Sequence, residues 1–321
     1  MNQYSGEQEV NNSSVHPKVH VPCPSLALPP KPEEPQVEDC CGQGCQPCIF
    51  DIYQQQMRAW EAECRRLEAS KYNTDTAEII SPLRWSPFRC VSVEHEAVNV
   101  NVYCFESTEC DRSINFSPWQ YLVAQSNLNV SISRAYTPLP GKTASQFNVI
   151  VKLYEGGLMS EFWKKVYCDE VVLWKGPYET GFHYNPNSYS HIVMFCAGTG
   201  LAPCFALAHY VTSNELDETF VRIIFSCRTR NNILLRQPLR KLRENWNFTS
   251  KTVLTQDNDT GLEKWYGEDL SSGRITSEVV SSELAGKSSV FVMICGTQSF
   301  NKDICCYVRK CGVREEDTLV L

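Results

Sequence analysis

The sequence predicts a two-domain fold, in which an antiparallel β barrel is followed by an α/β domain with a parallel sheet. From about Leu83, short alternating runs separated by turn residues indicate closely spaced strands, which are typical of a small antiparallel barrel. Beyond Tyr189, strands alternate with helices, which is typical of a parallel sheet with helices on both faces. The barrel strands are expected at 88–93, 98–105, 121–123, 130–133, 147–154 and 171–174.

Composition narrows the class of protein. The 321 residues, 42% of them hydrophobic and 21% charged, can form two domains and a tail. The net charge of −7 and the lack of a basic block argue against a nucleic-acid partner. No apolar run reaches the roughly 18 residues of a membrane span, which leaves peripheral contact with the cytosolic face of a membrane open. No apolar signal segment precedes the 17 cysteines, so we expect a reducing compartment, the cytoplasm.

The amino-terminal part contains a tail and a cysteine-rich unit. Residues 1–37 are rich in Asn, Ser, Gln and Pro, so we expect this tail to be disordered. The unit 38–75 begins with four closely spaced cysteines, Cys40, Cys41, Cys45 and Cys48. Four such thiols can bind one zinc ion or an iron–sulfur centre. The alternative is a packed group of thiols at a helix start, because adjacent cysteines are awkward joint ligands for one metal.

A helix is expected directly after these cysteines. Apolar residues recur at helical spacing from Ile49 to Leu67, with Gln, Arg and Glu between them. This pattern predicts an amphipathic helix whose apolar stripe is a docking face. The whole segment resembles the small oxidoreductase-like module found near the start of several eukaryotic proteins, a resemblance that implies little chemistry.

The stretch 191–203 predicts a nucleotide-binding turn in the second domain. Residues 191–196 form a predicted strand buried on both faces, and 203–212 a helix with Pro203 at its first position, where a missing N–H costs nothing. Between them lie Gly198, Thr199 and Gly200. Glycines let the backbone approach a bound group, and the free N–H groups of a helix start favour a phosphate. The third glycine of the dinucleotide fingerprint is absent, so an ordinary strand-to-helix turn is the alternative.

The alternation of strands and helices continues after this turn. The expected strands are 220–226, 251–254 and 289–295, and the expected helices are 236–244, 276–284 and 301–311. Glycines at the carboxyl end of such strands are where parallel sheets bind ligands.

Four separated motifs stand in these two domains. They are Arg134-Ala135-Tyr136-Thr137-Pro138, Gly156-Gly157-Leu158-Met159-Ser160, Ala197-Gly198-Thr199-Gly200-Leu201-Ala202-Pro203 and Cys295-Gly296. Each alone is more typical of a structural turn, but their order and spacing resemble those of the NADH-cytochrome b5 reductase family, ferredoxin-reductase-type flavoproteins. The resemblance implies an FAD-binding barrel over 80–185 and an NADH-binding domain over 186–321. It also implies an enzyme that moves a hydride from NADH to FAD and then single electrons to cytochrome b5 or another one-electron acceptor.

The resemblance further implies roles for the residues of the barrel. Arg134 pairs with the pyrophosphate of the flavin, a task suited to a planar, always charged fork. Tyr136 lies against the ribityl chain and the ring, and the Thr137 hydroxyl lies near flavin N5. The rest of the phosphate cradle is implied to be Val151, Tyr154, Gly157, Met159 and Ser160.

In the second domain, the resemblance implies that Thr199 touches both the flavin and the nicotinamide, and that Gly198, Gly200 and Pro203 shape the turn around it. Cys295, followed by Gly296, is implied to face the nicotinamide ring, although a cysteine at the end of a buried strand is otherwise a small apolar filler. The implied catalytic positions are Thr137, Thr199 and Cys295.

Selection of NADH over NADPH normally depends on an acidic residue near the ribose 2′-hydroxyl. Asp269 is the candidate, while Arg274 or Arg228 could instead bind a 2′-phosphate.

The chain also departs from the family pattern. Leu158 stands where commoner members have Lys, residues 297–300 replace the usual proline run, and the chain ends at Leu321 without the family's terminal aromatic residue. These departures leave open an alternative function, a non-enzymatic metal-binding or assembly protein that uses the Cys40–Cys48 cluster.

Overall fold

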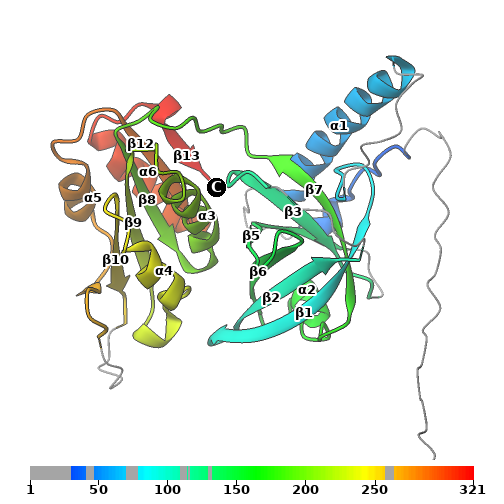
Figure 1. Ribbon diagram of the computed structural model, residues 1–321, viewed down its shortest axis with the longest axis horizontal. Coiled ribbons are helices and arrows are strands. Elements are labelled where there is room, and N and C mark those ends of the chain that lie inside the picture. The colour runs from blue at the N-terminus through cyan, green and yellow to red at the C-terminus, as the bar shows by residue number, and fades with distance from the viewer. Residues whose placement is uncertain are drawn as a thin grey trace, which may run out of the picture.

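The computed structural model describes residues 30–40, 47–69, 79–108, 114, 116–128, 132–256 and 264–321, with only the backbone of residues 63 and 65–69. Most of the predicted tail therefore lies outside the described residues. The chain forms a β-rich lobe and an α/β lobe, and helix α1 (Ile49–Ala69) lies against the outer side of the first lobe (Figure 1). The predicted fold class is confirmed, and so is the predicted helix after the cysteines.

The first lobe is an antiparallel sheet in the order β4-β3-β7-β1-β2-β6-β5. The sheet curls so that edge strand β4 contacts β6, and the short helix α2 (Leu158–Trp163) follows β6. Large aromatic side chains fill the interior, among them Phe105, which meets the Trp174 ring edge-on at 5.1 Å. The strands are β1 (Ser86–Ala97), β2 (Val100–Ser107), β3 (Gln120–Gln125), β4 (Ser133–Tyr136), β5 (Leu139–Pro140), β6 (Gln146–Lys152) and β7 (Val171–Glu179).

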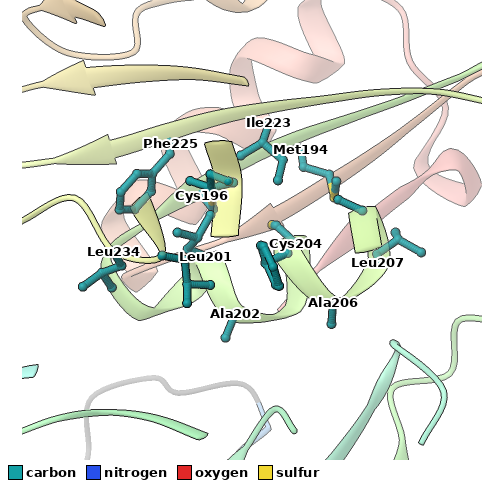
Figure 2. Close-up of a cluster of buried hydrophobic side chains, with 14 of the residues drawn as sticks. Met194, Cys196, Leu201, Ala202, Cys204, Ala206, Leu207, Ile223, Phe225 and Leu234 are labelled. Atoms are coloured by element: carbon teal, nitrogen blue, oxygen red, sulfur yellow. The ribbon is translucent and has the colours of Figure 1, made fainter. Parts of the chain in front are cut away.

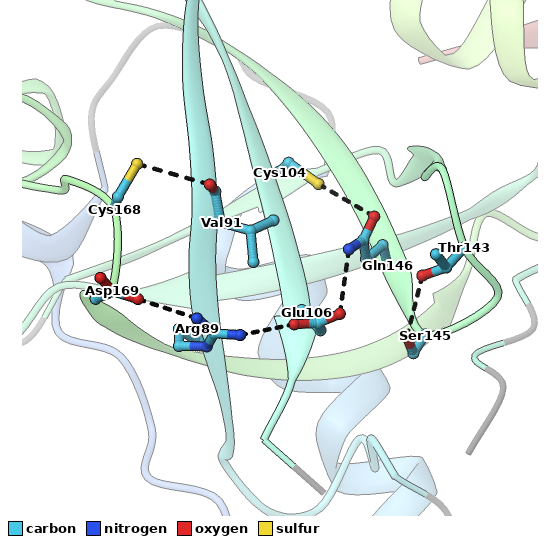
Figure 3. A network of polar contacts seen from close by, with 9 residues as sticks. All are labelled: Arg89, Val91, Cys104, Glu106, Thr143, Ser145, Gln146, Cys168 and Asp169. Carbon is cyan, nitrogen blue, oxygen red and sulfur yellow. Dashed lines mark hydrogen bonds and ion pairs between the residues drawn. The ribbon is translucent and has the colours of Figure 1, made fainter. Parts of the chain in front are cut away.

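A polar network crosses the outside of this sheet (Figure 3). Arg89 on β1 donates to Glu106 on β2 at 2.8 Å and to Asp169, before β7, at 3.0 Å. Gln146 on β6 donates to the other oxygen of Glu106 at 3.1 Å. Because Arg89 and Asp169 are largely exposed, these ion pairs contribute little free energy of folding. They do align three neighbouring strands.

The second lobe is a parallel sheet in the order β11-β10-β9-β8-β12-β13. The edge strands β11 and β13 were not expected, because they are short and β11 is mostly polar. The strands are β8 (His191–Ala197), β9 (Phe220–Cys227), β10 (Phe248–Leu254), β11 (Asp269–Ser272), β12 (Val290–Cys295) and β13 (Thr318–Val320). The helices are α3 (Leu201–Thr212), α4 (Arg236–Leu242), α5 (Ser277–Leu284) and α6 (Gln298–Lys310).

Strand β8 is buried on both faces, as predicted. Met194 and Cys196 pack toward α3 and α4 together with side chains of β9 (Figure 2), whereas Val193 and Phe195 pack toward α5 and α6. A strand covered on both faces needs a continuous apolar run rather than an alternating one, and 192–196 supplies it.

The start of α3 differs from the prediction. Residues Gly198–Gly200 form a 3-10 turn that continues directly into a helix from Leu201, so Pro203 is the third helical residue and not the first. The first four N–H groups of a helix have no partner within the helix, so a proline is tolerated at this place as well.

The two lobes share an apolar interface. Val100 and Ile150 of the barrel sheet belong to the same buried cluster as Ala202 and Phe205 of α3. Beside this cluster the Leu235 N–H donates to the carboxylate of Glu96 at 2.6 Å. The lobes therefore pack in a defined orientation, which places the glycine turn beside the barrel.

The segment between the lobes is tied to the second lobe by a buried polar network. The Tyr184 hydroxyl lies 2.8 Å from Asp217 Oδ2 and 2.7 Å from Thr219 Oγ1, and all three residues are buried. Asp217 also accepts from the Thr219 N–H at 3.2 Å.

Replacing Tyr184 by Phe removes a donor from a buried carboxylate. We expect Tyr184→Phe to lower the free energy of unfolding by about 2 kcal/mol, the usual contribution of a hydrogen bond to a charged group. Urea unfolding measures this change. Tyr266→Phe is the control, because Tyr266 is 98% exposed. Equal urea midpoints for the two variants would show that the Tyr184 hydroxyl adds nothing to the free energy of unfolding.

Candidate cofactor site

Strand β4 presents the first motif. Arg134 and Tyr136 share one side of the strand, and Ala135 points to the other. The Arg134 guanidinium donates to the Ser133 carbonyl at 2.8 Å, and among the described residues no carboxylate lies within ion-pair distance of it. A half-buried cation without an acidic partner fits a phosphate ligand.

The Tyr136 side chain connects β4 to the second motif. Its hydroxyl accepts a 2.6 Å hydrogen bond from Trp163 Nε1 at the end of α2, and the two rings meet edge-on at 5.3 Å. Burial raises the pKa of the Tyr136 phenol, so the side chain stays neutral. A neutral aromatic ring fixed in this way fits a wall beside a flavin.

The second motif is a tight turn into α2. Gly156 has a φ of +68°, a conformation that side chains other than glycine rarely adopt. A Cβ on Gly157 would lie 3.0 Å from Ser160 Oγ, which accepts from the Tyr154 N–H at 2.8 Å. Val151, Met159 and Ser160 are buried behind the turn. The N–H groups at the start of α2 are left for an outside acceptor such as a phosphate.

The third and fourth motifs meet at the carboxyl edge of the parallel sheet. A Cβ on Gly200 would lie 2.2 Å from the Cys295 carbonyl oxygen and 3.0 Å from its Sγ, so only glycine fits there. Thr199 precedes Gly200 in this turn and is half-buried. Burial raises the pKa of the Cys295 thiol, which keeps it neutral and a weak nucleophile.

The residues after Cys295 have structural roles. A Cβ on Gly296 would lie 2.5 Å from the Phe300 ring, and the Thr297 side chain caps α6 by accepting from the Phe300 N–H at 3.4 Å. The substituted stretch 297–300 therefore starts a helix. Leu321 donates its N–H to the Ile294 carbonyl at 2.9 Å, and the C-terminus lies between the lobes (Figure 1).

The domain interface brings the motifs of both lobes together. The 3-10 turn at 198–200 contacts β6, and α3 contacts β5, which follows Thr137 and the buried Pro138. Thr137 is half-buried at this junction. The first, third and fourth motifs therefore border one region between the lobes, and the Trp163–Tyr136 hydrogen bond links the second motif to the first.

Two cations lie at the ends of strands β6 and β9, namely Lys152, which the motifs did not reveal, and Arg228, one of the two arginines considered above for a 2′-phosphate. The pKa of Lys152 is lowered by burial and then by the charge of Arg228, which directly follows β9. Lys152 also lies over the Tyr154 ring at 5.3 Å. Within the described ranges neither cation has an acidic partner. Two cations that influence each other in this way fit an anion. The sequence marks Lys152 only as a lysine at the end of an apolar strand.

Asp269 is not brought to this region. It opens β11 opposite Lys251, and its carboxylate lies 3.3 Å from Arg222, the third residue of β9. Arg222 lies toward the amino end of β9, whereas the backbone of Asp269 is level with Ile224 of β9 and Phe195 of β8, in the middle of the sheet. Strands β10 and β9 separate β11 from β8 and its glycine turn, and contact of Asp269 with the ribose of a bound nucleotide stays a prediction.

The cysteine cluster is described only in part. The sulfur atoms of Cys40 and Cys48 are 3.8 Å apart, whereas Cys41 and Cys45 lie outside the described residues. Where the chain is described, no group of three or more His, Cys, Asp or Glu residues is placed to hold a metal ion. Metal binding at these four cysteines stays a prediction.

Comparison with known families agrees with this geometry. The oxidoreductase-like protein N-terminal model matches residues 25–69, the oxidoreductase FAD-binding domain 87–184 and the oxidoreductase NAD-binding domain 194–306. No helix in the described part of the chain has the length and apolar character needed to cross a bilayer.

Individual proteins are similar over most of the chain. NADH-cytochrome b5 reductase-like from Mus musculus is 30% identical over 296 residues, which cover 89% of this chain and 93% of that protein. The Homo sapiens protein of the same name is 29% identical over 294 residues, with the same coverage of both chains.

Solved structures share the fold. The cytochrome b5 reductase domain of Ulva prolifera nitrate reductase superposes with a TM-score of 0.67 at 20% identity, covering 76% of this chain and all of that domain. Flavohemoglobin from Malassezia yamatoensis, with bound FAD and heme, gives 0.65 at 21% identity, covering 87% of this chain and 70% of the other.

These matches extend across both lobes and the amino-terminal segment, and they do not support the alternative of a non-enzymatic protein. The chain belongs to the NADH-cytochrome b5 reductase family, as a flavoprotein oxidoreductase whose FAD- and NAD-binding domains follow an oxidoreductase-like amino-terminal segment.

Proposed function

We propose that the protein takes a hydride from NADH and passes single electrons to a heme-protein acceptor such as cytochrome b5. The contact of Gly200 with Cys295, at the edge of the sheet that faces the barrel motifs, carries this proposal. It provides a tight nicotinamide site next to the flavin site. Bound FAD supplies the conversion from a two-electron donor to one-electron transfer.

On the flavin side, the residues bind and orient the cofactor. Arg134 pairs with the pyrophosphate, and the N–H groups at the start of α2 with Met159 and Ser160 complete the cradle. Tyr136 provides a rigid wall because Trp163 holds its hydroxyl. Thr137 and Val151 to Tyr154 border the rest of the ring and the ribityl chain.

On the nucleotide side, Gly198, Thr199 and Gly200 shape the floor of the site, and Cys295 contacts the nicotinamide. The neutral Cys295 thiol excludes water there without reacting. Lys152 and Arg228 bind the phosphates of the dinucleotide, since both are cations without an acidic partner among the described residues. No proton has to be transferred by a side chain, so no acid–base pair is needed.

The choice of cytochrome b5 as the acceptor is based on the names of the relatives. Around the mouth of the site, Leu158 is 61% and Tyr154 56% exposed, so an acceptor meets a partly apolar surface there. Lys164 is paired with Glu161 at 2.6 Å, which reduces the local positive charge. We expect contact with the acceptor to depend on shape and apolar area as well as on charge.

The visible spectrum tests the function directly. We expect flavin bands in the purified full-length protein that bleach anaerobically on addition of one equivalent of NADH, more readily than with NADPH, and ferric cytochrome b5 that is then reduced. Bleaching without reduction of cytochrome b5 at any ionic strength would remove this acceptor. Faster bleaching with NADPH would reverse the choice of nucleotide. A colourless protein that takes up no FAD would refute the proposal as a whole.

Arg134 tests the flavin side. We expect Arg134→Ala to weaken FAD binding about 30-fold, equivalent to about 2 kcal/mol for a lost charge-assisted hydrogen bond. Arg134→Lys keeps the charge and loses only part of the affinity, because it lacks the planar fork. Titration of apoprotein with FAD measures both. Arg89→Ala, a barrel arginine outside the site, is the control, and full flavin retention by Arg134→Ala would exclude the assigned role.

Gly200 tests the nucleotide side. An added Cβ forces the turn and Cys295 apart, and a displacement near 1 Å can cost on the order of 100-fold in rate. On this basis we expect Gly200→Ala to lower the rate at which NADH reduces the bound flavin on the order of 100-fold, while FAD stays bound. Gly200 has a φ of −60°, which alanine adopts without strain, so any effect of its substitution comes from the contact of the new Cβ with Cys295. Gly286→Ala is the control for an added Cβ that meets no neighbour, since Gly286 has open space around it, although its φ of +71° adds backbone strain. Equal effects of the two variants would mean that the contact with Cys295 is not responsible.

A further inference from the structure

We propose that helix α1 positions the FAD site by bracing strand β4 from outside the barrel, and that Ile52 and Gln55 are its positioning residues. The amino-terminal segment then has a role in the same chain's flavin binding. This inference rests on the proposed binding of FAD at Arg134 and Tyr136. Its test distinguishes a failure of the α1 contact from a failure of FAD binding itself.

One face of α1 is seated on the barrel. Ile52 is only 4% exposed and forms a buried cluster with Tyr121, Val123 and Tyr178 on the outer side of β3 and β7. Phe50, two residues earlier on the same helix, is 37% exposed. The docking face is therefore specific, and Phe50 lies outside it.

Hydrogen bonds fix the register of this contact. The Tyr121 hydroxyl donates to Gln55 Oε1 at 2.8 Å. Gln56 lies near the Tyr178 hydroxyl, which donates to the Pro82 carbonyl at 2.9 Å. Ile52, Gln55 and Gln56 are spaced i, i+3 and i+4, so they lie on one side of the helix. A rotation or slide of α1 would break all of these contacts together.

The contact reaches the flavin strand through β3. In the β3–β4 ladder Val123 faces Ala135, while Ala124 and Leu122 face Arg134 and Tyr136. Ala135 packs against the cluster that contains Ile52. Because side chains alternate along a strand, support of Ala135 from outside places Arg134 and Tyr136 on the opposite side.

Strand β4 needs such support. It has four residues and lies at the edge of the sheet, with β3 as its hydrogen-bonded neighbour. A short edge strand opens more readily than an inner one. When only part of the molecules hold β4 in place, the apparent FAD dissociation constant rises by the reciprocal of that fraction.

The test is FAD affinity of full-length apoprotein, measured by quenching of flavin fluorescence. We expect Ile52→Ala to raise the FAD dissociation constant about tenfold, within the usual range of coupling between two sites. We expect Gln55→Ala to raise it about threefold on the same scale. Ile52→Val retains the apolar contact and stays near the wild-type value, and so does the control Phe50→Ala.

Thermal unfolding of the same variants, with and without saturating FAD, separates positioning from stability. If α1 positions β4, the rise in unfolding temperature caused by a fixed FAD concentration shrinks in Ile52→Ala. If Ile52→Ala and Gln55→Ala lower the unfolding temperature of the apoprotein but keep the wild-type FAD dissociation constant, the brace is refuted. If Ile52→Ala does not fold, the FAD dissociation constant of Gln55→Ala alone tests the brace. A wild-type protein that binds no FAD would instead refute the proposed function.

Discussion

The backbone of Gly200 passes so close to Cys295 that a β carbon at position 200 would lie 2.2 Å from the carbonyl oxygen of Cys295. This contact requires that β8 and β12 be neighbours in register, with Cys196 opposite Cys295. That register in turn depends on an apolar strand β8 covered on both faces by helices. The packing of the whole parallel sheet therefore fixes the shape of the glycine turn, where we propose that the nicotinamide binds.

The barrel supplies the other half of the site through a different kind of contact. The Trp163–Tyr136 hydrogen bond joins the end of α2 to strand β4, so two motifs distant in sequence form one rigid wall of the proposed flavin site. The apolar interface around Ala202 and Phe205 sets this wall opposite the glycine turn. Neither lobe alone has a complete site, which explains why the motifs are spread over both.

The amino-terminal helix adds a third layer to this arrangement. It packs on the outside of β3 and β7, and through Ala135 on the back of β4. A redox-inert helix can in this way be part of a redox enzyme, because the precision of a flavin site depends on how firmly its strands are held.

The local sequence by itself determined the order of strands and helices, the doubly buried strand β8 and the four motifs, because periodicity and glycine placement act over a few residues. Only the tertiary structure decided which distant residues meet. It paired Asp269 with Arg222, and it brought Lys152 close to Arg228 across the lobes. It also added the edge strands β11 and β13, and it started α3 at Leu201 instead of Pro203. Pairing, register and docking depend on contacts between residues tens to hundreds of positions apart, and no local pattern in the chain encodes them.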